Sequence, residues 1–258
     1  YGQWCDENMV YLRDHAKPIQ PVEKPINLLD LTLQQIAFGW DSEELKLIFK
    51  PMITTGAEAI GSMGDDTPLA ILSKKPRLLY SYFKQLFAQV TNPAIDSIRE
   101  KVVMSLSTCM GHRRSWLEES PEHASLLRID TPFLLEYELA SLANMDHPDV
   151  NAHTIGCHFP ASGSKHVLVD SLRSVCHQAS EAVENGCSVI ILSDRGTNEE
   201  KVPIPMLLAV GAVHHHLIRE GKRLKASIVC ETGEARDVHH FACLVGFGAS
   251  AVNPYVAI

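Results

Sequence analysis

The chain has 258 residues, of which 45% are hydrophobic, a size and composition typical of one large or two small packed domains. Its 31 acidic and 23 basic side chains give a net charge of -8, which repels nucleic acid and anionic membranes, and the basic cluster at 112–114 is too short to reverse this. No apolar run approaches the roughly 20 residues of a membrane helix, and the first residues lack the features of a signal peptide. We therefore expect a soluble, intracellular protein.

The seven cysteines are widely spaced and never form a Cys-x-x-Cys pair. This spacing argues against a disulfide framework, a zinc knuckle and a local iron–sulfur motif. Buried, reduced thiols that behave as small apolar side chains are expected instead. The cysteines are Cys5, Cys109, Cys157, Cys176, Cys187, Cys230 and Cys243.

The first 30 residues contain three prolines among charged residues and show little apolar periodicity. Such a segment predicts an extended connector that leads from an upstream domain into the main unit, residues 31–258. Within this unit we expect a mainly helical and loop part over 30–125, followed by repeated strand–helix units over 126–258.

Two helices are predicted in the first part. Asp41 or Ser42 can cap a helix that Pro51 ends, and a second helix starts near Pro76. Between them, residues 59–73 are rich in Gly, Asp and Pro, which indicates a shaped loop. Apolar residues fall at helical spacing in both helices: Leu45, Ile48 and Phe49 in the first, and Leu79, Phe83, Leu86 and Phe87 in the second.

From about residue 150 the chain alternates between short apolar runs and amphipathic helical stretches. This alternation predicts parallel strands with right-handed crossovers, in an open α/β sheet or an incomplete barrel. The alternation of strands and helices predicts another helix after Ile258. We therefore expect the natural polypeptide to continue there, so that the chain is truncated at its C-terminus. The predicted strands are 155–159, 189–192, 227–230 and 251–253, and the predicted helices carry apolar stripes over 168–182, 206–217 and 238–245.

Two runs of histidine suggest a metal site: His214, His215 and His216, and then His239 and His240. Consecutive residues of a helix point about 100° apart, and neither run contains the i, i+3 or i, i+4 pair that lets two imidazoles share one ion. Histidines of the core or of an interface are the favoured interpretation, so no metal ligand is predicted.

Motifs for a nucleophile or a phosphate site are missing from the sequence. It contains no Gly-x-Ser-x-Gly elbow and no Gly-x4-Gly-Lys loop, and it begins with Tyr1, not with a cysteine. The glycines of 246–248 end a predicted helix and precede a strand, the reverse of the order that a phosphate cradle needs. No catalytic and no cofactor-binding residue is therefore predicted for this chain.

Charged and polar residues gather just after the predicted strands. In an α/β sheet or barrel this is the face that carries the site. Two interpretations remain open: the strand-end site of an independent α/β enzyme, now or formerly active, or structural ion pairs and caps. The residues are Asp194, Arg195, Glu231, Thr232, Glu234, Arg236 and Asn253.

Residues 50–106, which begin KPMITTGAEAIGSMGDDTPLAILS, closely resemble the central domain of glutamate synthases. The resemblance continues through 189–196, 209–221 and 231–255, so it covers nearly the whole chain after the first 25 residues. Only 108–126 departs from it.

This resemblance implies a parent enzyme in which an amidotransferase domain hydrolyses glutamine. Ammonia then passes inside the protein to a flavin domain with FMN and an iron–sulfur cluster, where 2-oxoglutarate becomes glutamate. The central domain joins these two domains, its partners in the same polypeptide, and resembles the flavin-binding barrel without binding flavin. Alone it is expected to bind no cofactor and to catalyse nothing. Ferredoxin and NAD(P)H both remain open as electron donors, and cytoplasm and plastid as compartments.

An internal ammonia path needs small, short polar side chains without a fixed charge. Two loops, 61–68 and 89–93, are rich in small and short polar residues, and the charged Asp65 and Asp66 of the first are expected to cap or brace it and not to line a path. Both loops are also compatible with plain turns against a neighbouring domain. The candidates for the path or for a domain interface are Ser62, Met63, Thr67, Thr91 and Asn92.

Overall fold

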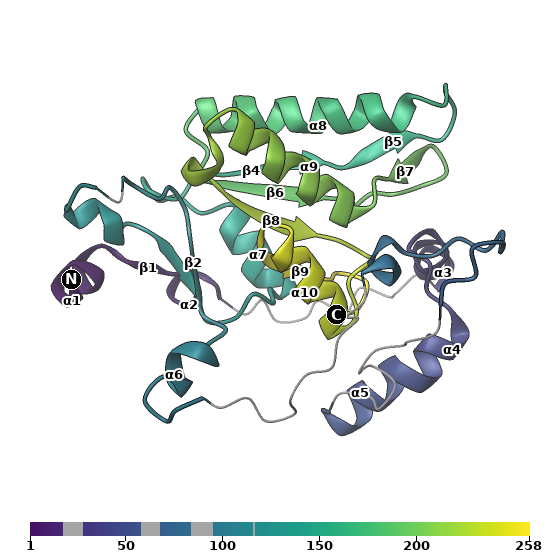
Figure 1. Cartoon of the computed structure of the whole chain (residues 1–258), viewed down its shortest axis with the longest axis horizontal. Coiled ribbons are helices and arrows are strands. Elements are labelled where there is room, and N and C mark those ends of the chain that lie inside the picture. Colours follow the sequence, from purple (N-terminus) through teal and green to yellow (C-terminus); the bar gives the residue numbers. More distant parts are fainter. Residues whose placement is uncertain (18–27, 58–67, 84–94, 116) are drawn as a thin grey trace.

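The computed structural model describes residues 1–17, 28–57, 68–83, 95–115 and 117–258 (Figure 1). Its centre is a sheet of four parallel strands whose order in space, β4-β6-β8-β9, is their order along the chain. The α/β prediction with parallel strands is therefore confirmed. The strands are β4 (Ala152–Gly156), β6 (Val189–Ser193), β8 (Ser227–Glu231) and β9 (Ala249–Asn253).

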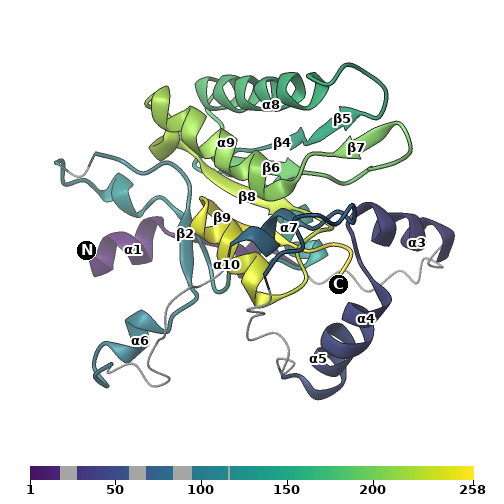
Figure 2. The ribbon, with the colours of Figure 1, turned by 45° about the vertical axis from the view of Figure 1, so that its right-hand side comes forward.

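Three crossover helices cover one face of this sheet (Figures 1 and 2). They are α8 (Val167–Glu184), α9 (Met206–Arg219) and α10 (Val238–Gly246), at the positions that the apolar stripes predict. The stripes pack onto alternate residues of the strands, among them Ile190 and Leu192, and this removes both surfaces from water.

A second layer covers the opposite face. It contains a three-stranded sheet, in the order β1-β3-β2, and the helices α2 (Leu12–His15) and α7 (Glu136–Ala143). Val189, Ile191 and Val229 point into this layer. Because both faces of the central sheet are buried, β6 reads as a continuous apolar run. The small strands are β1 (Val10–Tyr11), β2 (Thr108–Met110) and β3 (Leu127–Ile129).

The N-terminal segment differs from the prediction. We expected an extended connector over 1–30, but residues 1–17 form α1 (Gly2–Asn8), β1 and α2, with Val10 and Leu12 buried in the second layer. Val10 pairs with Leu127, which lies far along the sequence. β1 is too short to show any periodicity, and this distant partner holds it in place. β2 likewise joins the predicted 30–125 part to β3 of the 126–258 part.

Pro51 does not end the first helix as predicted. The helical path runs through α4 (Ser42–Glu44), a π-helical turn (Leu45–Phe49) and α5 (Lys50–Thr55). In the π turn the Lys50 N–H donates to the carbonyl of Leu45, five residues earlier. The next residue, Pro51, has no N–H, so no backbone donor is left without a partner there and the helix continues. The cap is as predicted, since Asp41 accepts the Glu44 N–H at 2.8 Å.

In the described part of the second predicted helix the chain forms a 3-10 turn over Leu79–Tyr82, and the expected residues Leu86 and Phe87 lie outside the described ranges. Further short elements are α3 (Leu28–Ala37), α6 (Glu100–Val103), 3-10 turns over Pro121–Ala124 and Arg223–Lys225, and an antiparallel pair β5 (His158–Pro160) and β7 (Lys201–Pro203). Across the described ranges, no helix has both the length and the apolar character to cross a membrane.

Candidate functional site

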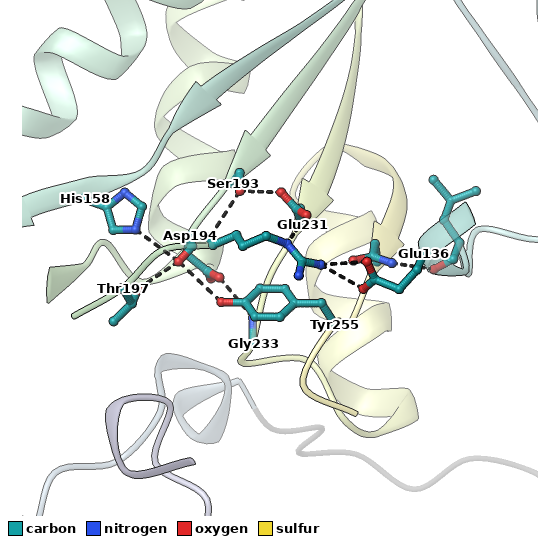
Figure 3. Close-up of polar contacts among 11 residues, drawn as sticks. Glu136, His158, Ser193, Asp194, Thr197, Glu231, Gly233 and Tyr255 are labelled. Carbon is teal, nitrogen blue, oxygen red and sulfur yellow. Dashed lines mark hydrogen bonds and ion pairs between the residues drawn. The ribbon is translucent and has the colours of Figure 1, made fainter. Parts of the chain in front are cut away.

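Asp194 and Glu231, two of the predicted strand-end residues, lie together at one edge of the central sheet (Figure 3). Asp194 follows β6, Glu231 closes β8 and Asn253 closes β9. Backbone hydrogen bonds link the three ends, from Asp194 N–H to the Glu231 carbonyl and from Thr232 N–H to the Asn253 carbonyl. Parallel strands bring their carboxyl ends to the same edge, which is why the sequence could identify this set.

Asp194 is completely buried at this edge. Its carboxyl accepts the Thr232 hydroxyl at 2.5 Å and the Gly233 N–H at 3.0 Å. The backbone carbonyl of Asp194 accepts the Thr197 hydroxyl at 2.8 Å and the Tyr255 hydroxyl at 3.3 Å, and His158 Nε2 lies 3.0 Å from it (Figure 3). Burial raises the pKa of Asp194 to about 7, and the Thr232 hydrogen bond opposes this shift.

Glu234 is also a buried carboxylate, and its hydrogen-bond partners are groups of this chain. Glu234 Oε2 accepts the Tyr80 hydroxyl and the backbone N–H of Met206, both at 3.1 Å. Met206 is the first residue of α9, so Glu234 satisfies a free N–H at the positive end of that helix. Burial raises the pKa of Glu234 above its usual range, and burial together with Glu234 raises that of Tyr80.

Arg195 forms an ion-pair network on the outer rim. Its Nε donates to Glu231 at 2.5 Å, and its Nη2 donates to both carboxylate oxygens of Glu136, at 2.8 and 2.9 Å. The guanidinium lies over the ring of Tyr255, 4.2 Å from the centroid, and Ser193 Oγ bonds the other oxygen of Glu231. Both carboxylates of the network are therefore engaged by side chains of this chain.

Arg236 ties a distant segment to the same edge. It donates to both carboxylate oxygens of Glu44, at 2.8 and 2.7 Å, and to the backbone carbonyls of Phe38 and Gly39, each at 3.0 Å. Its guanidinium also lies 4.8 Å from the ring centroid of Trp40. Since only 5% of its side chain is exposed, Arg236 is a buried anchor, not a group open to a substrate.

Residues 38–44, which we call the strap, cover the strand ends. Phe38 is 1% exposed, and Trp40 Nε1 donates to the Gly233 carbonyl at 3.1 Å. A Cβ atom at Gly233 would lie only 2.4 Å from ring carbons of Phe38, so a side chain at residue 233 would force the ring to move. The strap therefore fills the space where many α/β folds receive a ligand.

Asn253 completes the predicted set. It is fully buried, and its Nδ2 donates to the Leu134 carbonyl at 2.9 Å, which fixes the loop before α7 against β9. Among the described residues its Oδ1 has no hydrogen-bond partner. A hollow lined by His158, Phe159 and Lys201 lies between β5 and β7, but the strand-end carboxylates do not line it.

The sequence did not reveal which residues would form hydrogen bonds and ion pairs with the strand-end side chains. Glu44, Tyr80, Glu136 and Tyr255 were not among the predicted site residues, although each bonds one of them. Glu44 looks like an ordinary carboxylate in the first turn of a helix, and 192 positions separate it from Arg236. No local pattern carries such a pairing.

The histidine runs have structural contacts. His214 Nδ1 accepts Arg223 Nε at 2.9 Å, and His239 Nε2 lies 3.1 Å from the Tyr80 carbonyl. Burial lowers the pKa of His240 to about 4, and its ring lies 4.4 Å from that of Tyr80. In the described part of the chain, no group of three or more His, Cys, Asp or Glu side chains could hold a metal ion.

The ammonia-path candidates cannot be placed. Ser62, Met63, Thr67, Thr91 and Asn92 all lie outside the described residues.

Comparison with known proteins identifies the family. Residues 33–258 match the family model of the glutamate synthase central domain. The chain is 45% identical to ferredoxin-dependent glutamate synthase 2 of Arabidopsis thaliana and 42% identical to the NADPH glutamate synthase large chain of Bacillus subtilis, over its full length and 16% of each relative. It is 39% identical to the NADH glutamate synthase of Schizosaccharomyces pombe, over 13% of that protein. The chain therefore belongs to the glutamate synthase central domain family.

Proposed function

We propose that this chain is a non-catalytic scaffold within a glutamate synthase that makes glutamate from glutamine and 2-oxoglutarate. In this proposal it joins the glutamine amidotransferase domain to the FMN-binding domain of the same polypeptide. The observation that carries the proposal is the strap: Phe38 and Trp40 cover the strand ends, and the buried acidic groups beneath them take their hydrogen bonds from this chain.

The strap favours the scaffold over the alternative, an enzyme that uses the strand-end carboxylates. A general acid or base must lie within hydrogen-bond reach of its substrate. Asp194 and Glu234 are instead covered, and Arg236 is held by Glu44 and two carbonyls. Each group has a structural use at its present position, so no substrate is needed to explain it.

The relatives support a role that is independent of the electron donor. Proteins named for ferredoxin, NADPH and NADH share this domain at 45, 42 and 39% identity. We propose that FMN and the iron–sulfur cluster of the parent are held by its other domains. An intracellular compartment, cytoplasm or plastid, follows from the same proposal.

We expect FMN to leave the melting temperature of the 258-residue chain unchanged. A flavin phosphate needs a nest of free backbone N–H groups after a strand. β9 ends at Asn253, whose side chain donates to the Leu134 carbonyl, and the next residue is Pro254, which has no N–H. The measurement is thermal unfolding with and without FMN, together with the visible spectrum of the dialysed protein.

A bound flavin would be easy to detect in this test. FMN at about 100 times its dissociation constant would stabilise the chain by about 2.7 kcal/mol. A dissociation constant in the low micromolar range, or yellow protein after dialysis, would contradict the scaffold proposal and revive a strand-end site.

We further propose that the domain helps to form the internal ammonia path, with Thr91 as the first lining candidate. Thr91→Val removes the hydroxyl and keeps the volume. In the full-length enzyme it should leave glutamine hydrolysis and ammonia-dependent synthesis intact but raise the amount of glutamine hydrolysed per glutamate formed. The bulkier Thr91→Phe should raise this ratio further.

Thr54→Val is the matched control for this ratio, because Thr54 is exposed on α5 and, among the described residues, its hydroxyl donates to backbone carbonyls of its own helix. It should keep the wild-type ratio. If both Thr91 variants also keep it, residue 91 does not line the path and its loop is a structural turn.

A further inference from the structure

Residues 95–107, which we call the α6 arm, display a concentrated set of apolar side chains. The arm includes α6 and lies away from α8 and α9 in both views (Figures 1 and 2). Five large apolar residues occur within nine positions, and all are exposed. Their exposed fractions are 87% for Ile98, 79% for Val102, 56% for Val103, 66% for Met104 and 66% for Leu106.

The arm is ordered by local polar contacts and not by burial. Asp96 Oδ1 accepts the backbone N–H groups of Ile98 at 3.1 Å and Arg99 at 2.9 Å, and Oδ2 pairs with the Arg99 side chain. At the other end, Ser107 Oγ accepts Arg128 Nε at 3.0 Å, and β2 follows directly. Since the five apolar side chains belong to neither buried cluster, the arm holds them out from the domain.

Such a surface is typical of an interface. Single exposed apolar side chains are common on soluble proteins, whereas several large ones exposed close together in one segment are typical of a binding surface. The charged residues of the arm are Asp96, Arg99, Glu100 and Lys101, two of each sign. This balance of charge gives no attraction to an anionic membrane, so it favours a protein partner.

We propose that the α6 arm docks onto another part of the glutamate synthase polypeptide, outside these 258 residues. This inference rests on the proposed function and specifies one of its interfaces. The chain makes up only 16% of the relatives of Arabidopsis thaliana and Bacillus subtilis. A domain tethered in the same polypeptide reaches a high effective concentration, so it outcompetes a second copy of the chain for the apolar patch.

Cysteine labelling tests the docking directly. Val102→Cys and Ile98→Cys are prepared both in the full-length enzyme and in the 258-residue chain, and reaction with a maleimide is followed by peptide mass spectrometry, which separates the new thiol from the native ones. Both positions should label at least about tenfold more slowly in the full-length enzyme, because labelling then requires the docked domains to separate locally. In urea, each variant should label at the same rate in both proteins.

Two results would overturn the proposal. Equal labelling rates in the folded full-length enzyme and the folded 258-residue chain would mean that no other part of the polypeptide covers the arm. Protection in the 258-residue chain that disappears on dilution would assign the surface to a second copy. Either result leaves the scaffold proposal standing, because that proposal fails on FMN binding and not on labelling.

Discussion

Phe38→Ala is expected to lower the free energy of unfolding of the 258-residue chain by about 3 to 5 kcal/mol, the usual cost of removing a buried aromatic ring. Phe38 lies against Gly233, with its ring edge-on to Tyr255 at a centroid distance of 6.1 Å. The loss should be accompanied by loosening of the strap. Urea denaturation, with hydrogen exchange over residues 38–44, measures both effects.

Gly233→Ala probes the same contact from the other side. The added methyl would lie 2.4 Å from the Phe38 ring, so the variant should lose about 1 to 3 kcal/mol by overpacking. In the Phe38→Ala background this cost should disappear. Gly246→Ala is the control, because among the described residues no atom beyond its chain neighbours and its own helix backbone lies within 4 Å of a Cβ placed there. Strictly additive effects of Phe38→Ala and Gly233→Ala would show that the ring does not rest on the strand end.

The second large effect should be a pH-dependent difference between wild type and Asp194→Asn. Burial raises the pKa of Asp194 from 3.8 to about 7 in the folded chain, so the folded state holds a proton that the unfolded state releases. The stability from this group is complete below pH 3.8 and is lost as pH rises through 7. The loss amounts to about 1.4 kcal/mol per pH unit and about 4 kcal/mol in all.

Asp194→Asn cannot ionise, so its stability relative to wild type should rise between pH 5 and pH 7. The difference between the two proteins is needed because other groups titrate in this range. His240, with its pKa lowered to about 4, has the opposite sign: its contribution is present above pH 6.5 and is lost as pH falls through 4. Parallel stability profiles for wild type and Asp194→Asn would contradict the raised pKa of Asp194.

Regular elements of the fold were predictable because their patterns are local. The stripe of α8 and its end before Gly186, which has φ +86°, follow from helical spacing and the needs of a left-handed turn. The apolar run of β6 predicts a strand buried on both faces. β1 and the pairing of β2 with β3 were missed, since strands of two or three residues show no periodicity.

The same distinction, between local patterns and contacts distant in sequence, applies to the candidate site. The sequence by itself determined the family, the parallel strand–helix order and the meeting of Asp194, Glu231 and Asn253 at one edge, because each depends on patterns within short stretches of chain. Only the tertiary structure decided that this edge is closed. Phe38 reaches Gly233 and Glu44 reaches Arg236 across nearly 200 positions, and Asp194 and Glu234 are buried among hydrogen-bond donors of this chain.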